Sequence, residues 1–152
     1  MRVSAKADYA VRAMIELAAG AEEAPVKGEL VAQSQEIPVR FLENILAELR
    51  HAGLVHSRRG TDGGYWLARR ADEITLAEII RSVEGPLATV RGEPADELSY
   101  AANLKPLQAV WIALRANIRE ILESVTLADV ASGELPAPVR EIASQPDVWQ
   151  TR

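Results

Sequence analysis

The most restrictive feature of the sequence is residues 38–69, where one amphipathic helix runs directly into a glycine-closed hairpin. Pro38 suits the first turn of that helix, where a missing N–H is not needed, and Gly53 ends it. Two strand-like runs, 54–58 and 65–69, flank the glycine-rich sequence RGTDGG. Over 39–52 the apolar residues recur at helical spacing and predict one inward stripe: Leu42, Ile45, Leu46 and Leu49.

Further helices are predicted on both sides of this unit. Ser4 can cap a helix over 4–19, and a short helix over 28–35 precedes a turn at 35–38. Thr75 and Glu78 have the spacing of a capping box for a helix over 76–84. The order helix, helix, turn, helix, hairpin is that of a winged helix-turn-helix. We therefore predict a mainly α fold with a small β-hairpin.

A long helix is predicted over 104–125, after an irregular stretch at 86–103. Apolar residues form a seam along one face of this helix. That face either binds a second copy of the chain or packs on the first domain, and the heptad spacing of the seam favours a dimerisation helix. Thr126 and Asp129 predict a short capped helix. The tail contains three prolines and is expected to be loosely ordered, although Trp149 could anchor it onto a dimer. The residues of the seam alternate at spacings of three and four: Leu104, Leu107, Trp111, Leu114, Ile118, Ile121 and Val125.

Charge is distributed unevenly along the chain. Residues 1–70 contain 10 basic and 9 acidic residues, a net charge of +1, whereas 71–152 contain 7 and 13, a net charge of −6. A local basic surface matters more than the overall charge when the partner is phosphate. Near the start of the 39–52 helix, on its polar face, lie three residues able to hydrogen-bond base edges: Arg40, Glu43 and Asn44.

Arg58 and Arg59 lie at the hairpin, where they could neutralise phosphates or enter a narrow minor groove. Taken singly, each of these five polar residues could equally belong to the solvated face of a helix or hairpin. Together they indicate double-stranded DNA as the partner.

Several classes of site are excluded or disfavoured by composition. The chain has no cysteine, which excludes disulfides, thiolate metal sites and a cysteine nucleophile. His51 and His56 lack a third ligand, so we expect no metal and no cofactor. The sequence contains no P-loop, dinucleotide fingerprint or HExxH motif, and we expect no catalytic residues. It also has no signal peptide or membrane span, which indicates a cytoplasmic protein.

The sequence resembles the bacterial winged helix-turn-helix transcription regulators of the IscR, NsrR and CymR type. The resemblance covers about residues 1–131 and is most specific over 37–69, where paired glycines precede Tyr65. It implies a homodimer with crossing long helices that binds a palindromic operator. By position it matches Glu43 and Arg59 to DNA contacts of the family, whereas the other three candidates rest on geometry alone.

Two departures from the family stand out. Thr61 and Asp62 replace the more usual Pro-Gly of the wing. The three cysteines of cluster-binding members are absent, and Lys105 stands near the position of the last one. Oxygen and amine side chains are poor replacements for thiolates on iron–sulfur units, so we predict that no cluster binds.

We therefore expect a sequence-specific transcription regulator, a repressor acting as a homodimer. Its effector would be an unknown small molecule or protein, or it would act constitutively. The alternative is a winged-helix protein-interaction module controlled by a partner protein. The expected parts are a DNA-binding domain over 1–85, a degenerate sensor loop over 86–103, a dimerisation helix region over 104–132 and a tail over 133–152.

Overall fold

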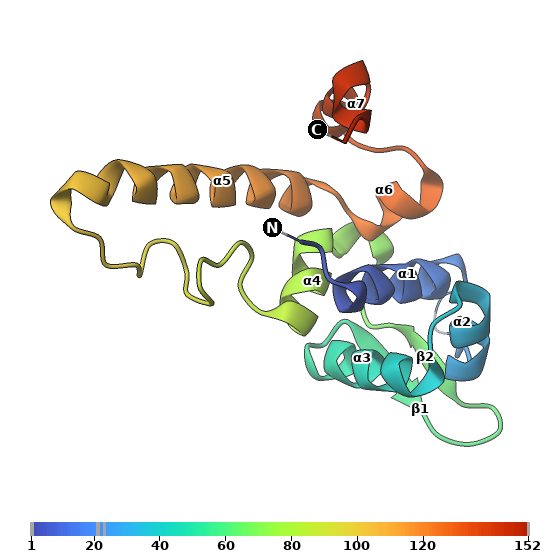
Figure 1. The fold of residues 1–152 in the computed structure, drawn as a ribbon. Helices are drawn as coiled ribbons and strands as arrows, with labels where there is room; N and C mark the ends of the chain where they lie inside the picture. Colours follow the sequence, from blue (N-terminus) through green and yellow to red (C-terminus); the bar gives the residue numbers. More distant parts are fainter. Residues whose placement is uncertain (1, 21, 23, 152) are drawn as a thin grey trace.

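The structure is a computed structural model that describes residues 2–20, 22 and 24–151. Figure 1 shows the first half of the chain gathered around α1, with the long helix α5 extending away from it and α7 standing above. The α-helices are α1 (Ala5–Ala19), α2 (Gly28–Gln35), α3 (Val39–His51), α4 (Leu76–Glu84), α5 (Lys105–Ser124), α6 (Leu127–Ser132) and α7 (Ala137–Ala143). The strands are β1 (Val55–Arg58) and β2 (Gly64–Leu67), and short 3-10 turns are η1 (Ala71–Glu73), η2 (Ala102–Leu104) and η3 (Pro146–Trp149).

The predicted fold class is confirmed, because the chain is mainly helical with a two-stranded hairpin. Its core lies between α1 and α3, and α1 also packs against α2, α4 and α6. Met14 of α1 is fully buried there. The inward stripe of α3 is confirmed as well, since each of its members is at most 1% exposed: Leu42, Ile45, Leu46 and Leu49.

The hairpin pairs β1 with β2 in antiparallel register, from Val55 opposite Leu67 to Arg58 opposite Gly64. A segment before α2 adds to it, because Val26 and Tyr65 exchange both backbone hydrogen bonds at 2.8 Å. Gly64 has a φ of +151°, and a Cβ there would lie 2.5 Å from the Val26 carbonyl oxygen. A glycine at this position therefore allows the wing to dock against the segment that leads into α2.

The loop before α5 forms a strap along that helix. The side-chain amide of Gln108 donates to the carbonyl oxygens of Ala95 (3.2 Å) and Leu98 (2.9 Å), and Arg115 forms an ion pair with Asp96. The guanidinium of Arg115 lowers the pKa of the Asp96 carboxyl. Strap and helix together make a long arm (Figure 1). None of the helices in the described ranges is long and apolar enough to cross a membrane.

The arm returns to the first half of the chain through a short backbone pairing. Thr126 pairs with Thr75, and the Leu127 N–H donates to the Ile74 carbonyl oxygen at 2.8 Å. The predicted capping box between Thr126 and Asp129 forms and starts α6. Since α6 packs on α1, the end of the arm is attached firmly to the winged part of the chain.

The expectation of a loosely ordered tail is wrong. Residues 137–143 form α7, and η3 follows it. The prolines do not prevent this, because Pro138 lies in the first turn of α7 and Pro146 begins η3. A proline is tolerated at these positions, where no helical partner exists for its missing N–H. The indole N–H of Trp149 donates to the Ala143 carbonyl oxygen at 2.5 Å and holds η3 against α7.

A matched pair of leucine substitutions tests the core. Leu46 is 0% exposed, so Leu46→Ala should lower the free energy of unfolding by about 2–5 kcal/mol through lost burial and a cavity. Leu30 is 57% exposed on α2, and Leu30→Ala should change the free energy of unfolding by about 0.5 kcal/mol or less. Urea unfolding at one protein concentration measures both, and equal effects would contradict the assignment of the core.

A pair of glycine substitutions tests the docking of the wing. Both Gly64 and Gly60 have positive φ, but only a Cβ at Gly64 would collide with backbone. We therefore expect Gly64→Ala to destabilise the protein clearly more than Gly60→Ala, whose strain costs about 1–3 kcal/mol. Hydrogen exchange at the Tyr65 amide should accelerate in the Gly64 variant alone. Unchanged protection of that amide would mean that the wing does not depend on this close approach.

Candidate nucleic-acid interface

The exposed face of α3 brings together three of the predicted DNA-binding residues. Arg40, Glu43 and Asn44 are all exposed, because the opposite face of the helix is buried in the core. The helix has 13 residues and is therefore about 20 Å long, which is short enough to lie in a major groove. In Figure 1 it lies at the edge of the molecule, on the opposite side of α1 from α7.

The turn between α2 and α3 is fixed from α1. Glu36 has a φ of 55°, the left-handed conformation that ends α2. The guanidinium of Arg12 donates to both the side-chain and the backbone oxygen of Gln35, and the Gln35 amide donates to Glu16 at 2.7 Å. Sequence reasoning missed this role of Arg12, because the contact joins residues 23 positions apart and leaves no local pattern.

The wing carries the other two candidates. Arg58 and Arg59 are exposed, and the guanidinium of Arg58 donates to the Asp62 carbonyl oxygen at 3.1 Å. Lys27, at the start of α2, donates to the Gly60 carbonyl oxygen at 2.7 Å and so holds the tip of the wing. This lysine was also missed, since its partner lies 33 residues away.

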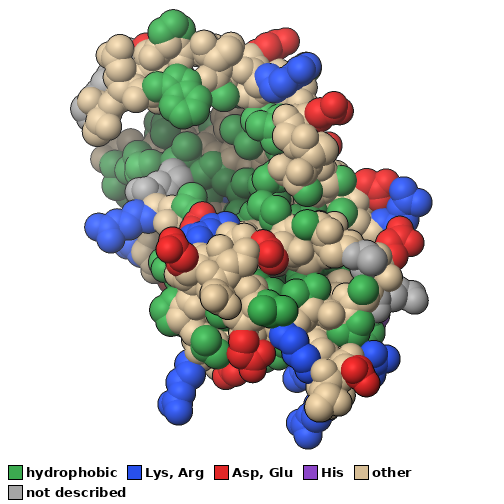
Figure 2. Space-filling view, turned by 90° about the vertical axis from the view of Figure 1, so that its right-hand side faces the viewer, with side chains coloured by type: hydrophobic (Ala, Val, Ile, Leu, Met, Phe, Trp, Pro, Cys, Tyr) green, Lys and Arg blue, Asp and Glu red, His purple; other side chains and the backbone are tan. Residues whose placement is uncertain are grey.

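A further cation links α3 to the wing. Arg50, near the end of α3, donates to the hydroxyl of Ser57 on β1 at 3.1 Å. The orientation of the hairpin is thereby coupled to that of the helix. Figure 2 shows several Lys and Arg side chains protruding from the lower end of the molecule, where α3 and the hairpin lie in Figure 1.

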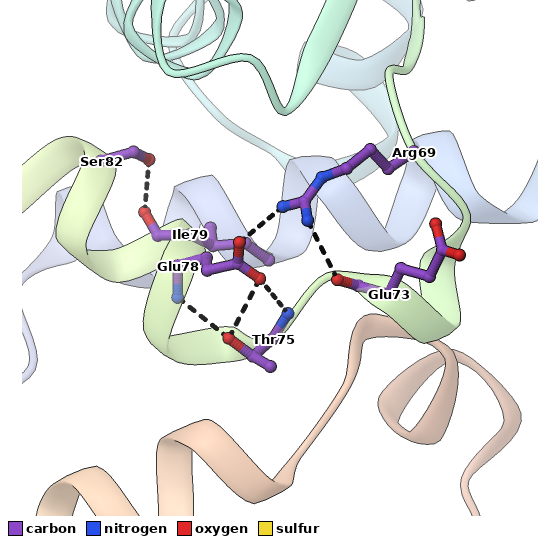
Figure 3. Close-up of polar contacts among 6 residues, drawn as sticks. All are labelled: Arg69, Glu73, Thr75, Glu78, Ile79 and Ser82. Atoms are coloured by element: carbon purple, nitrogen blue, oxygen red, sulfur yellow. Dashed lines mark hydrogen bonds and ion pairs between the residues drawn. The ribbon is translucent and has the colours of Figure 1, made fainter.

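The end of the wing is anchored to α4 through Arg69 (Figure 3). Its guanidinium donates to the Glu78 carboxylate at 2.6 Å and to the Glu73 carbonyl oxygen at 3.4 Å. Glu78 also completes the predicted capping box with Thr75. Burial opposes ionisation of Glu78, but the hydrogen bonds from the Thr75 N–H and from Arg69 outweigh it and lower its pKa. The chain leaving the hairpin therefore enters α4 with a fixed direction.

The residues of the predicted seam along α5 lie in different surroundings. Leu104, Leu107 and Ile121 are exposed, whereas Val125 is only 3% exposed and packs within its own chain. The other three members, Trp111, Leu114 and Ile118, are partly buried. The indole nitrogen of Trp111 is buried and has no hydrogen-bond partner in the described part of the chain.

The two histidines lie in different surroundings. His56 lies against Trp66 of the wing, with ring centroids 5.8 Å apart, and His51 is exposed at the end of α3. Among the described residues, no three His, Asp or Glu side chains converge to hold a metal ion.

Known proteins similar to this chain are transcriptional regulators. A protein of Mycobacterium tuberculosis (strain H37Rv) described as an HTH-type transcriptional regulator is 50% identical over 143 residues, which span 94% of this chain and 89% of that protein. The HTH-type transcriptional regulator CymR of Bacillus subtilis is 39% identical over 132 residues, spanning 87% of this chain and 91% of CymR.

Solved structures agree with these relatives. The structure of CymR, the global cysteine regulator of B. subtilis, superposes with a TM-score of 0.73 at 37% identity, covering 87% of this chain and 97% of that one. The structure of T. potens IscR superposes with a TM-score of 0.69 at 34% identity, covering 99% and 97%. The winged helix-turn-helix prediction is thereby confirmed.

The family itself follows from the match over most of the chain. Residues 3–133 match the model of the Rrf2 family, described as an iron-dependent transcriptional regulator. The resemblance inferred from the sequence is therefore confirmed, and it places the chain among regulators rather than enzymes. The helix-turn-helix, the wing and the relatives all lead to one conclusion: this chain belongs to the Rrf2 family of transcriptional regulators.

Proposed function

We propose that this Rrf2-family regulator represses transcription by binding a palindromic operator as a homodimer. The observation that carries the proposal is the orientation of α3. Its apolar stripe is buried to 1% exposure or less, so its polar residues are directed outward. Sequence-specific recognition requires such a rigid polar helix face in the major groove.

Each candidate side chain has a role that its chemistry supports. Arg40 can donate two hydrogen bonds to guanine, Asn44 can pair with adenine, and Glu43 can accept from the amino group of cytosine. Arg58 and Arg59 would contact phosphates or the adjacent minor groove. Because Lys27 and Arg50 hold the hairpin, the wing would approach the backbone in one orientation.

The exposed side of α5 supports the homodimer. Leu104, Leu107 and Ile121 present apolar surface there, and exposed apolar surface of this kind marks interaction sites. Within the expected 104–132 region we assign dimerisation to α5, because α6 packs on α1. We assign DNA binding to 1–85, and we place the protein in the cytoplasm with its DNA.

The residues of this chain do not fit an iron–sulfur cluster, although the family is described as iron-dependent. The chain has no cysteine to supply thiolates, and the 86–103 loop is bound to α5 through Gln108 and Arg115. We therefore assign its control to an effector other than a bound cluster, a small molecule or a partner protein, or to constitutive binding.

Charge reversal in the wing tests DNA binding. Replacing Arg58 and Arg59 with Glu should abolish a mobility shift on the DNA upstream of the protein's own gene, since attraction to phosphate becomes repulsion. Arg91→Glu reverses one charge on an exposed residue of the loop before α5 and should leave the shift intact. The measurement is a titration at several salt concentrations.

Two results would contradict the proposal. Equal binding of the unaltered protein to upstream and random DNA at moderate salt would remove sequence specificity. A partner complex that forms without DNA binding, and that survives the double charge reversal, would favour the alternative, a protein-interaction module.

Reconstitution tests the absence of a cluster. Anaerobic incubation with iron and sulfide, followed by desalting, should leave no sulfur-to-iron charge-transfer absorption and no stoichiometric iron, because thiolates are the ligands that such clusters require. Stable visible absorption with stoichiometric iron would overturn this expectation.

A further inference from the structure

The C-terminal unit, residues 134–151, carries an apolar surface that its own chain leaves open. Ile142 is 48% exposed, Val148 49% and Trp149 78%. The unit is nevertheless folded, since α7 packs on η3 and the Trp149 indole is held by the Ala143 carbonyl. An ordered segment that exposes a tryptophan has the character of an interface anchor, because aromatic residues dominate the binding energy of interfaces.

The arm exposes a second apolar surface of the same kind. Leu107, Val110, Leu114 and Ile121 are separated by three, four and seven positions and therefore share one side of α5. Gln108 and Arg115 lie toward the strap instead. One side of α5 is thus occupied by its own chain, and the neighbouring side is open.

The tail overhangs a hollow in the surface of the molecule (Figure 2). Figure 2 shows a recess beneath the tail, with hydrophobic side chains on its walls, in a view from the end of the molecule where α6 and α7 lie in Figure 1. In this orientation α5 runs away from the viewer, behind this end of the molecule.

The size of the α5 contact indicates that the dimer needs more surface. A helix of 20 residues is about 30 Å long and roughly 10 Å wide, so its facing side covers on the order of 300 Å². A standard stable interface buries about 800 Å² per partner. The accessible surface buried under a footprint is larger than the footprint itself, but two helices that cross touch over only part of their length, so we expect surfaces other than α5 to contribute to a stable dimer. In a two-fold dimer each copy offers one open α5 side and one tail, so the two surfaces are present in equal number.

We propose that the C-terminal unit of each copy closes over α5 of the other copy, with Trp149, Val148 and Ile142 covering the part of its open apolar side, around Val110, that lies beside the seam. The proposal rests on the homodimer proposed above and gives it a second contact, continuous with the α5 seam. The tail is then a clasp that determines how tightly the dimer holds, separate from the surfaces that read DNA.

The first experiment measures the dissociation constant of the dimer by sedimentation equilibrium on the full-length protein. The double variant Ile142→Ser/Trp149→Ser should raise it at least about tenfold, because anchor residues of interfaces contribute on this scale. Gln150→Ser, an exposed polar change in the same tail, should leave it unchanged. At protein concentrations above the new dissociation constant, the double variant should still bind DNA. An unchanged dissociation constant in the double variant would overturn the clasp.

The second experiment locates the tail directly, and the absence of cysteine makes it possible. One sample carries Asn117→Cys with a nitroxide on α5, and the other carries 5-fluorotryptophan, with Trp149→Phe identifying the Trp149 resonance. In mixed dimers that resonance should broaden, because the clasp would bring the fluorine of one copy close to the nitroxide of the other. A sharp resonance, in a mixture that sedimentation shows to be dimeric, would overturn the clasp and leave the homodimer intact. A chain that stays monomeric would overturn the homodimer and the clasp together.

Discussion

Burial of one side of α3 is the constraint on which the rest of the structure depends. Four side chains at about 1.5–3 kcal/mol each contribute a gross stabilisation of roughly 6–12 kcal/mol, as large as the net stability of a typical domain. The helix cannot rotate without losing this contribution. The direction of Arg40, Glu43 and Asn44 is therefore set by hydrophobic packing rather than by any interaction of their own. Stability and the proposed recognition of DNA therefore depend on opposite sides of the same helix.

The remaining elements transmit this fixed orientation. Arg12 connects α1 to the turn before α3, and Arg50 connects the end of α3 to the wing. Arg69 then joins the end of the wing to α4, and the pairing of Thr75 with Thr126 joins α4 to the end of the arm. An operator composed of two half-sites requires that the reading helices be held at a defined separation. In the proposed dimer, the continuous series of polar contacts between the winged part of the chain and the arm would provide that rigidity.

The loop before α5 shows how an arm can be ordered without a metal cluster. Two backbone carbonyls accept from Gln108, and Arg115 pairs with Asp96, so the polar groups of the strap are satisfied by the helix that it accompanies. Apolar residues of the strap, including Leu87, Ala95 and Leu98, are buried. Order in this segment thus comes from side chains of α5 and from burial of the segment's own apolar residues, and it needs no thiolate ligand.

Local patterns in the sequence determined much of this protein. Helical periodicity gave α3 and its stripe, residue spacing gave both capping boxes, and the paired glycines indicated the wing, because each of these signals acts within a few residues. The prolines of the tail led to the wrong prediction of a loosely ordered segment, since the effect of a proline depends on whether it falls in the first turn of a helix. Only the tertiary structure decided the contacts of Arg12 and Lys27 and the division of the α5 seam. Those depend on which distant segments meet when the core closes, and no local pattern records that.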